Sequence, residues 1–115
     1  MPQRVCVDAS LAIKVIIPEP YSDRAISLWE NWVENDVERI APPFFPFEVA
    51  SVIRGKYVRK QLASEEARTA FDIFTRLGFT LLMPEELLKE AWEMSWEFGL
   101  PTLYHTAYLA LAILY

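Results

Sequence analysis

The chain has 115 residues, of which 53% are hydrophobic and 23% are charged. This length fits one domain, 1–115, and the high apolar fraction excludes a disordered chain. Sixteen acidic and eleven basic residues give a net charge of −5, which argues against binding nucleic acid through a large, uniformly basic face. The charge does not exclude a nucleic-acid enzyme that works through cations held by carboxylates.

The cysteine content and the apolar runs indicate the compartment. The single cysteine, Cys6, cannot form an internal disulfide, which fits a reducing environment. The first residues do not show the basic region, apolar stretch and cleavage site of a signal peptide. Lys14 interrupts one apolar segment, and His105 lies near the start of the last one, so neither is long enough to span a membrane. We therefore expect a cytoplasmic protein with no membrane association.

The first half of the chain predicts two strands and three helices. Segment 4–7 is rich in valine and predicts a short buried strand that ends at Asp8. Ser10 is a suitable cap for a helix that ends before Pro18. The pattern further predicts a surface helix over 21–34, a second strand over 37–41, and a helix that starts at Pro46 and runs to about residue 60.

The second half continues the alternation. A helix is expected over 64–77 with Gly78 as its C-terminal cap, followed by a third strand over 79–83. Two further helices are expected over 84–98, closed by Gly99, and from Thr102 to the last residue. Strands that alternate with helices predict an α/β fold with a mainly parallel central sheet covered on both faces.

Asp8 is the first candidate for a functional side chain. In an open parallel sheet, ligands bind outside the carboxyl ends of the strands, and Asp8 directly follows the first strand. A carboxylate there can hold a hard cation such as Mg²⁺ or Mn²⁺. The structural alternative is that Asp8 or Ser10 only caps the following helix.

Glu48 is the second candidate. Helical spacing places it beside Phe45, Val49 and Val52, at the border of an apolar stripe where an unpaired charge is costly. A cation or base would relieve that cost. The alternative is an ordinary exposed glutamate near a helix start, which the helix dipole favours.

His105 is the third candidate. It shares a helix face with Tyr108, Leu109 and Ala112, so it is expected to point inward. Two interpretations are open: a histidine satisfied within the core, or a ligand for Mn²⁺ or Zn²⁺.

Two further groups of residues are more plausibly structural. Arg54, Lys56, Arg59 and Lys60 form the main basic cluster, which suits either phosphate contact or a solvated helix face. Four tryptophans recur at helical spacing, and we expect core or interface packing rather than base stacking from Trp29, Trp32, Trp92 and Trp96.

Three segments together resemble the PIN-domain family, and most closely the toxin ribonucleases of VapBC-type toxin–antitoxin pairs. They are VCVDASLAIKVIIPEP, PFFPFEVASVIRG and LPTLYHTAYLALA, and their order and spacing carry the resemblance over nearly the whole chain. It implies a PIN-like three-layer sandwich and metal-dependent cleavage of RNA with Mg²⁺ or Mn²⁺. By position, Asp8 and Glu48 match the first two acids of the family site. Ser10 and Arg54 are carried over as substrate-binding residues.

The sequence departs from the family pattern at two places. His105 stands where the family has its third acid, before the stretch AYLALA. A fourth acid and one more strand normally follow, but the sequence reaches Tyr115 first, so the expected sandwich lacks its last strand. Asp8, Glu48 and His105 would form the metal site, and they supply less negative charge than four carboxylates. We therefore expect weaker Mg²⁺ binding and a preference for Mn²⁺ or Zn²⁺.

Three function classes follow from these observations. The first is a metal-dependent endoribonuclease toxin with an RNA substrate, an antitoxin protein partner, a homodimeric state and DNA contact only through the antitoxin. The second is a catalytically inactive PIN-like module that dimerises or binds an antitoxin through the helices around Trp29 and Trp92. The third, a receiver-like or flavodoxin-like module, is disfavoured because paired acids after the first strand and a glycine-rich phosphate loop are both missing from the sequence.

Overall fold

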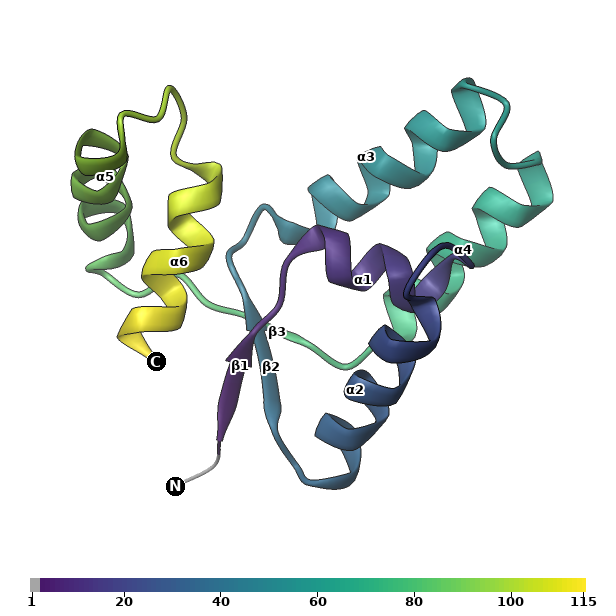
Figure 1. Cartoon of the computed structure of the whole chain (residues 1–115), viewed down its shortest axis with the longest axis horizontal. Helices are drawn as coiled ribbons and strands as arrows, with labels where there is room; N and C mark the ends of the chain where they lie inside the picture. Colours follow the sequence, from purple (N-terminus) through teal and green to yellow (C-terminus); the bar gives the residue numbers. More distant parts are fainter. Residues whose placement is uncertain (1–2) are drawn as a thin grey trace.

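A parallel sheet of three short strands lies at the centre of the computed structural model, which describes residues 3–115 (Figure 1). The sheet order is β1-β2-β3, with β1 at Arg4–Cys6, β2 at Glu38–Ala41 and β3 at Thr80–Leu81. The described part of the chain also forms α-helices at Ala9–Ile16 (α1), Ser22–Glu34 (α2), Phe45–Val58 (α3), Ser64–Arg76 (α4), Leu87–Phe98 (α5) and Tyr104–Leu114 (α6). The predicted α/β class with a parallel sheet is confirmed.

The register of the sheet brings the ends of β1 and β2 together. Cys6 lies opposite Ile40, and the Val7 N–H donates to the Ile40 carbonyl at 2.9 Å. Ala41 lies opposite Leu81 on the other side of β2. Because both pairings are parallel, the segments that leave β1 and β2 emerge at the same edge of the sheet.

The two faces of the sheet bury separate cores because side chains alternate along a strand. Val7 and Ala41 pack into a core shared with α1–α4, centred on the fully buried Phe45. Cys6 and Ile40 face the opposite core, which α5 and α6 cover. Figure 1 shows α5 and α6 together on one side of the sheet and the other four helices on the opposite side. No helix within residues 3–115 is both long and apolar enough to cross a membrane.

Several helix boundaries differ from the sequence prediction. The first helix starts at Ala9 rather than at residue 11, because Asp8 and not Ser10 is its cap. Gly78 does not adopt the left-handed cap conformation, and its carbonyl instead accepts a hydrogen bond from Arg39 Nε at 2.9 Å. Gly99, by contrast, has φ +63° and closes α5 as predicted.

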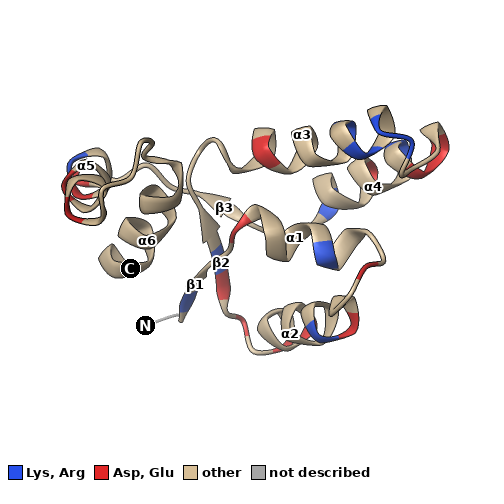
Figure 2. Ribbon diagram, turned by 45° about the horizontal axis from the view of Figure 1, so that its top comes forward, with Lys and Arg blue, Asp and Glu red and all other residues tan. Residues whose placement is uncertain are grey.

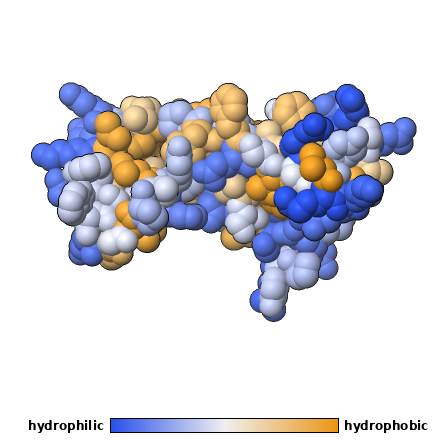
Figure 3. All heavy atoms as spheres, turned by 90° about the horizontal axis from the view of Figure 1, so that it is seen from above, coloured by the Kyte–Doolittle hydropathy of each residue, from blue (hydrophilic) through white to orange (hydrophobic). Residues whose placement is uncertain are grey.

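The tryptophans divide between the core and the surface. Trp29 is buried at 5% exposure and packs edge-to-face on Trp32, so packing explains this pair as expected. Trp92 and Trp96 are 51% and 70% exposed on α5. Trp29 itself is thus a core residue, while Leu28 and Val33 on the same helix are exposed, so association through the helices around Trp29 and Trp92 stays a prediction. Figure 3 shows hydrophobic residues interspersed with hydrophilic ones over this face, at the α5–α6 side, in the middle and at the opposite end.

Candidate functional site

A pocket of about 630 Å³ opens at the edge of the sheet where β1 and β2 end. Its walls come from the start of α1, from the turn after α1, from α3 and from α6. These elements belong to both layers of helices. The side chains that line it and carry polar groups are Asp8, Ser10, Glu19, Glu48, Lys56, His105 and Tyr108.

Asp8 caps α1 and also lines the pocket. Its Oδ1 accepts a hydrogen bond from the Leu11 N–H at 2.9 Å, so the predicted capping role is confirmed. No hydrogen bond within the described residues involves the second carboxylate oxygen, and the side chain is exposed. Capping and ligand binding are therefore compatible, because each can use a different oxygen.

Glu48 is partly buried on the first turns of α3, beside the buried Val49, as the apolar stripe predicted. Burial raises the pKa of the Glu48 carboxyl, and the Asp8 carboxylate raises it further, while His105 and the Tyr108 hydroxyl lower it. No basic side chain within residues 3–115 forms an ion pair with Glu48. This partly desolvated carboxylate therefore has no basic side chain as its counter-ion among the described residues. A carboxylate that serves as a ligand for a cation would have the same property.

His105 is exposed, so the expectation that it points into the core is wrong. The core-facing side of α6 is formed by Thr106, Ala107, Ala110 and Leu111, which leaves His105 on the flank of the helix. The grouping of His105 with Tyr108 and Leu109 is correct, because all three line the pocket. The interpretation of His105 as a core residue with its hydrogen bonds made within the protein is therefore wrong.

Tyr108 is a polar residue of the pocket that sequence reasoning missed. Its Oη is buried and has no partner in hydrogen-bonding geometry among the described residues. Burial raises the pKa of the Tyr108 hydroxyl strongly, and the Glu48 and Asp8 carboxylates add to this effect. Tyr108 therefore keeps a neutral hydroxyl beside the Glu48 carboxylate at neutral pH.

Cys6 lies behind the pocket and is not suited to its chemistry. Its Sγ is 3.5 Å from the Tyr108 carbonyl oxygen, to which the thiol donates. Burial, assisted by the Asp8 carboxylate, raises the pKa of the Cys6 thiol to about 11. The thiol is thus protonated at neutral pH, whereas nucleophilic attack and metal binding require the thiolate.

The residues of the pocket fit a cation only in part. Among residues 3–115, His, Cys, Asp and Glu side chains form no group of three or more placed to hold one ion. Mg²⁺ commonly uses one or two carboxylates and completes its octahedron with water and substrate phosphate. Asp8 and Glu48 match that smaller requirement.

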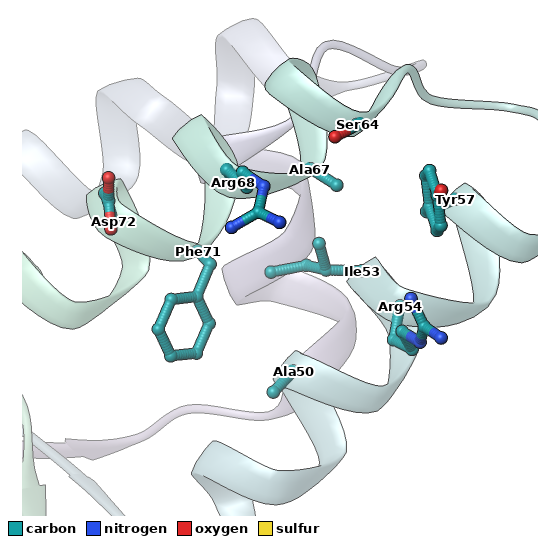
Figure 4. Close-up of a pocket in the computed structure, with 9 residues that line it drawn as sticks. All are labelled: Ala50, Ile53, Arg54, Tyr57, Ser64, Ala67, Arg68, Phe71 and Asp72. Atoms are coloured by element: carbon teal, nitrogen blue, oxygen red, sulfur yellow. The ribbon is translucent and has the colours of Figure 1, made fainter.

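Arg54 faces a different hollow from the carboxylates. This hollow is a groove of about 430 Å³ between α3 and α4. Figure 4 shows Arg54 and Tyr57 on one side of the groove and Arg68 and Phe71 on the other. The Arg54 guanidinium lies 5.4 Å from the centre of the Tyr57 ring. Of the two residues expected to bind substrate, Ser10 lines the carboxylate pocket and Arg54 does not.

Lys56 is the basic residue that α3 directs toward the carboxylate pocket. It follows Glu48 and Val52 at intervals of four residues, and all three line the pocket. This i, i+4, i+8 spacing was the signal that could have separated Lys56 from its basic neighbours. Figure 2 shows acidic residues at the starts of α1 and α3 and basic residues toward the other end of α3.

Comparison with known proteins does not identify the chain. No protein-family model matches the sequence, and no curated protein sequence matches it at a significant level. The function must therefore be argued from the site.

Proposed function

We propose that this protein is a divalent-cation-dependent endoribonuclease of the PIN-domain, VapC toxin type, which hydrolyses RNA phosphodiesters. One observation carries the proposal. Asp8 and Glu48 are distant in the sequence, yet they line the same pocket where two parallel strands end. The resemblance of the three sequence segments to PIN domains supplies the reaction and the substrate class.

The roles of the side chains follow from their charges. Asp8 and Glu48 would hold Mg²⁺ or Mn²⁺, because a cation between them offsets the burial and mutual repulsion that raise the pKa of Glu48. When bound, the cation supplies a Lewis acid that activates water and neutralises phosphate charge. His105 lines the same pocket but is not placed to share one ion with both carboxylates, so a preference for Mn²⁺ or Zn²⁺ would require its imidazole to move to the cation. The Ser10 hydroxyl, which is exposed at the pocket, can donate a hydrogen bond to a phosphate oxygen.

The partners of the proposed ribonuclease come from the resemblance. They are an antitoxin protein and a second copy of the chain in a homodimer, with DNA bound only through the antitoxin. A cytoplasmic location fits an RNA substrate and a single cysteine.

The test is cleavage of labelled single-stranded and structured RNA by the purified protein with Mg²⁺, Mn²⁺ or EDTA. We expect cleavage that EDTA abolishes and that Asp8→Asn and Glu48→Gln each reduce at least about a hundredfold, since each removes a cation ligand. Glu86→Gln is a matched control, because this acid lies before α5 and outside the pocket. Equal cleavage by Asp8→Asn and the unmodified protein would overturn the proposal.

His105→Asp gives the proposal a second readout. The substitution places a third carboxylate at the pocket, so we expect tighter Mg²⁺ binding by calorimetry and faster cleavage in Mg²⁺. Unchanged Mg²⁺ affinity would show that His105 does not belong to the cation site.

The alternative is a catalytically inactive module that acts by association. The exposed Trp92 and Trp96 on α5 favour this alternative, since exposed indoles are common at interfaces. The two proposals differ in metal binding: calorimetric binding of Mn²⁺ that Glu48→Gln abolishes would count against an inactive module.

A further inference from the structure

A cluster of three charged side chains adjoins the carboxylate pocket: Glu19 and Lys56 line the pocket, and Lys14 contacts Glu19 from outside its lining. The Glu19 carboxylate lies between two lysines, with Oε1 3.2 Å from Lys14 Nζ and Oε2 3.7 Å from Lys56 Nζ. Lys14 Nζ also donates to Ser10 Oγ at 3.5 Å. These contacts link α1, the turn after it and α3.

The turn that carries Glu19 is fixed by its own hydrogen bonds. The Glu19 N–H donates to Ser22 Oγ at 2.9 Å, and Ser22 Oγ donates to the Ile17 carbonyl at 3.1 Å. Ser22 is buried, and Tyr21 takes the left-handed conformation that reverses the chain. Glu19 is thus held in place by the backbone rather than by the lysines alone.

The cluster carries a surplus of positive charge. Two ammonium groups face one carboxylate, which leaves a net charge of +1 among these three side chains. The side chains of Lys56 and Glu19 are each only 22% exposed, so their charges are less screened than those of surface residues. Lys56 thus contributes a positive charge to a pocket wall that also carries the carboxylates of Asp8, Glu19 and Glu48.

Lys56 retains hydrogen-bonding capacity in this arrangement. Its contact with Glu19, at 3.7 Å, is longer than a good hydrogen bond, and an ammonium group has three N–H donors. The residue lines the pocket wall on the same face of α3 as Glu48. Eight residues of helix separate the two, which is about 12 Å at 1.5 Å per residue. About three to four steps along a stacked strand span that length at 3.4 Å per step.

We propose that Lys56, positioned by Glu19, binds a phosphate of the RNA strand about three to four nucleotide steps from the one that Asp8 and Glu48 address. This inference rests on the proposed function for the identity of the anion as RNA. It assigns the substrate contact to Lys56 rather than to Arg54, which faces the groove between α3 and α4.

The test measures binding of a short single-stranded RNA in EDTA, so that binding is separated from cleavage. We expect Lys56→Met to weaken binding about tenfold at low salt and to reduce the slope of log K against log salt by about 0.7, as loss of one phosphate contact requires. Lys56→Arg retains the charge and should stay within about threefold of the unmodified protein.

Lys60→Met is the matched control. It removes the same charge just beyond the end of α3, but this lysine lines neither the carboxylate pocket nor the groove. We expect its affinity to change less than about twofold. Unchanged binding by Lys56→Met would overturn the proposal, and so would an equal loss in Lys60→Met, which would indicate general attraction to a basic helix end. Thermal melting of each variant verifies that it is folded.

Binding and cleavage measurements distinguish the proposed role of Lys56 from the proposed ribonuclease activity. RNA binding that depends on Lys56 without any cleavage supports the subsite and contradicts the ribonuclease. Cleavage with an unchanged KM in Lys56→Met supports the ribonuclease and contradicts the subsite.

Discussion

The two faces of the sheet pack against hydrophobic cores of different size and composition. The face covered by α1–α4 buries an aromatic cluster in which Phe45 packs edge-to-face on both Phe74 and Phe79, at 5.7 and 5.1 Å between ring centres. The face covered by α5 and α6 buries a smaller set of mainly aliphatic residues around Leu111. The first layer therefore supplies more of the apolar burial that stabilises the fold.

The carboxylate pocket lies where these layers meet. Asp8, Glu48 and Lys56 come from the aromatic layer, whereas His105 and Tyr108 come from the aliphatic one. The charged groups are thus fixed by the larger core, and the imidazole and the phenol depend on how α6 sits against it. We therefore expect substitutions in the aromatic layer to lower stability most. Substitutions in the aliphatic layer should mainly change the positions of His105 and Tyr108.

Truncation in the aromatic layer has the largest expected effect. Phe45→Ala should lower the free energy of unfolding by about 3–5 kcal/mol, because Phe45 is fully buried and loses both aromatic contacts. Urea unfolding followed by circular dichroism measures this loss. Phe45→Leu keeps much of the volume and should cost clearly less. A smaller loss for Phe45→Ala than for a truncation in the other layer would contradict the ranking of the two cores.

Truncation in the aliphatic layer comes next. Leu111→Ala should cost about 2–4 kcal/mol, since Leu111 of α6 is fully buried in the core shared with α5 and the sheet. Ile113→Ala on the same helix is the control, because Ile113 is 71% exposed and should change stability by less than about 0.5 kcal/mol. Amide hydrogen exchange should accelerate in α6 before α3. Equal acceleration in both helices would show that the layers open as one unit.

Substitution of Asp8 separates its structural contact from its proposed ligand role. Asp8→Ala should cost about 1 kcal/mol through loss of the cap to the Leu11 N–H, while Asp8→Asn keeps a capping oxygen and should cost less. Both remove a carboxylate, so both should weaken binding of Mn²⁺ measured by calorimetry. Ser10→Ala should leave stability nearly unchanged, since Ser10 is exposed within the first turn of α1. A larger loss in Ser10→Ala than in Asp8→Ala would reverse the assignment of the cap.

The sequence was sufficient for the order of the elements and for part of the site. Valine-rich segments and helical periodicity predicted all three strands and all six helices within residues 3–115, although β3 is only Thr80–Leu81. Asp8 and Glu48 were found because the chain places acids directly after a strand and at the border of an apolar stripe. Such positions follow from local pattern and from the topology of parallel sheets.

The side-chain directions at the pocket could not be predicted in the same way. His105 lies on the flank of α6 because the small residues Ala107 and Ala110 pack closest to the core, which is a property of the tertiary contact. Lys56 and Arg54 are two residues apart on α3, so they face different hollows, yet composition treats them as one basic cluster. Which face of a helix meets which neighbour is decided by packing over the whole chain.

The smallest expected effect concerns the charge of Glu48. Its pKa is raised in the folded protein, so folding favours the protonated form, and this contribution to stability is present at low pH and is lost as pH rises through the raised pKa. At pH 7 the ionised side chain therefore destabilises the fold slightly, and Glu48→Gln should gain a few tenths of a kcal/mol there, because the group is partly solvated. Near pH 4 the gain should vanish.

Thermal melting of the two proteins across pH 4–8 measures whether Glu48→Gln gains stability as the pH rises. The same melts with Mn²⁺ test whether Glu48 binds the cation. A cation that binds the folded state raises its stability in proportion to RT ln(1 + [L]/Kd), so Mn²⁺ should stabilise the unmodified protein more than Glu48→Gln. Glu85→Gln provides the comparison for an exposed acid on the aliphatic side of the molecule. If Glu48→Gln is stabilised by Mn²⁺ as much as the unmodified protein is, the Glu48 carboxylate does not hold the cation. The metal affinity of the pocket would then depend on Asp8 or on the side chains of α6.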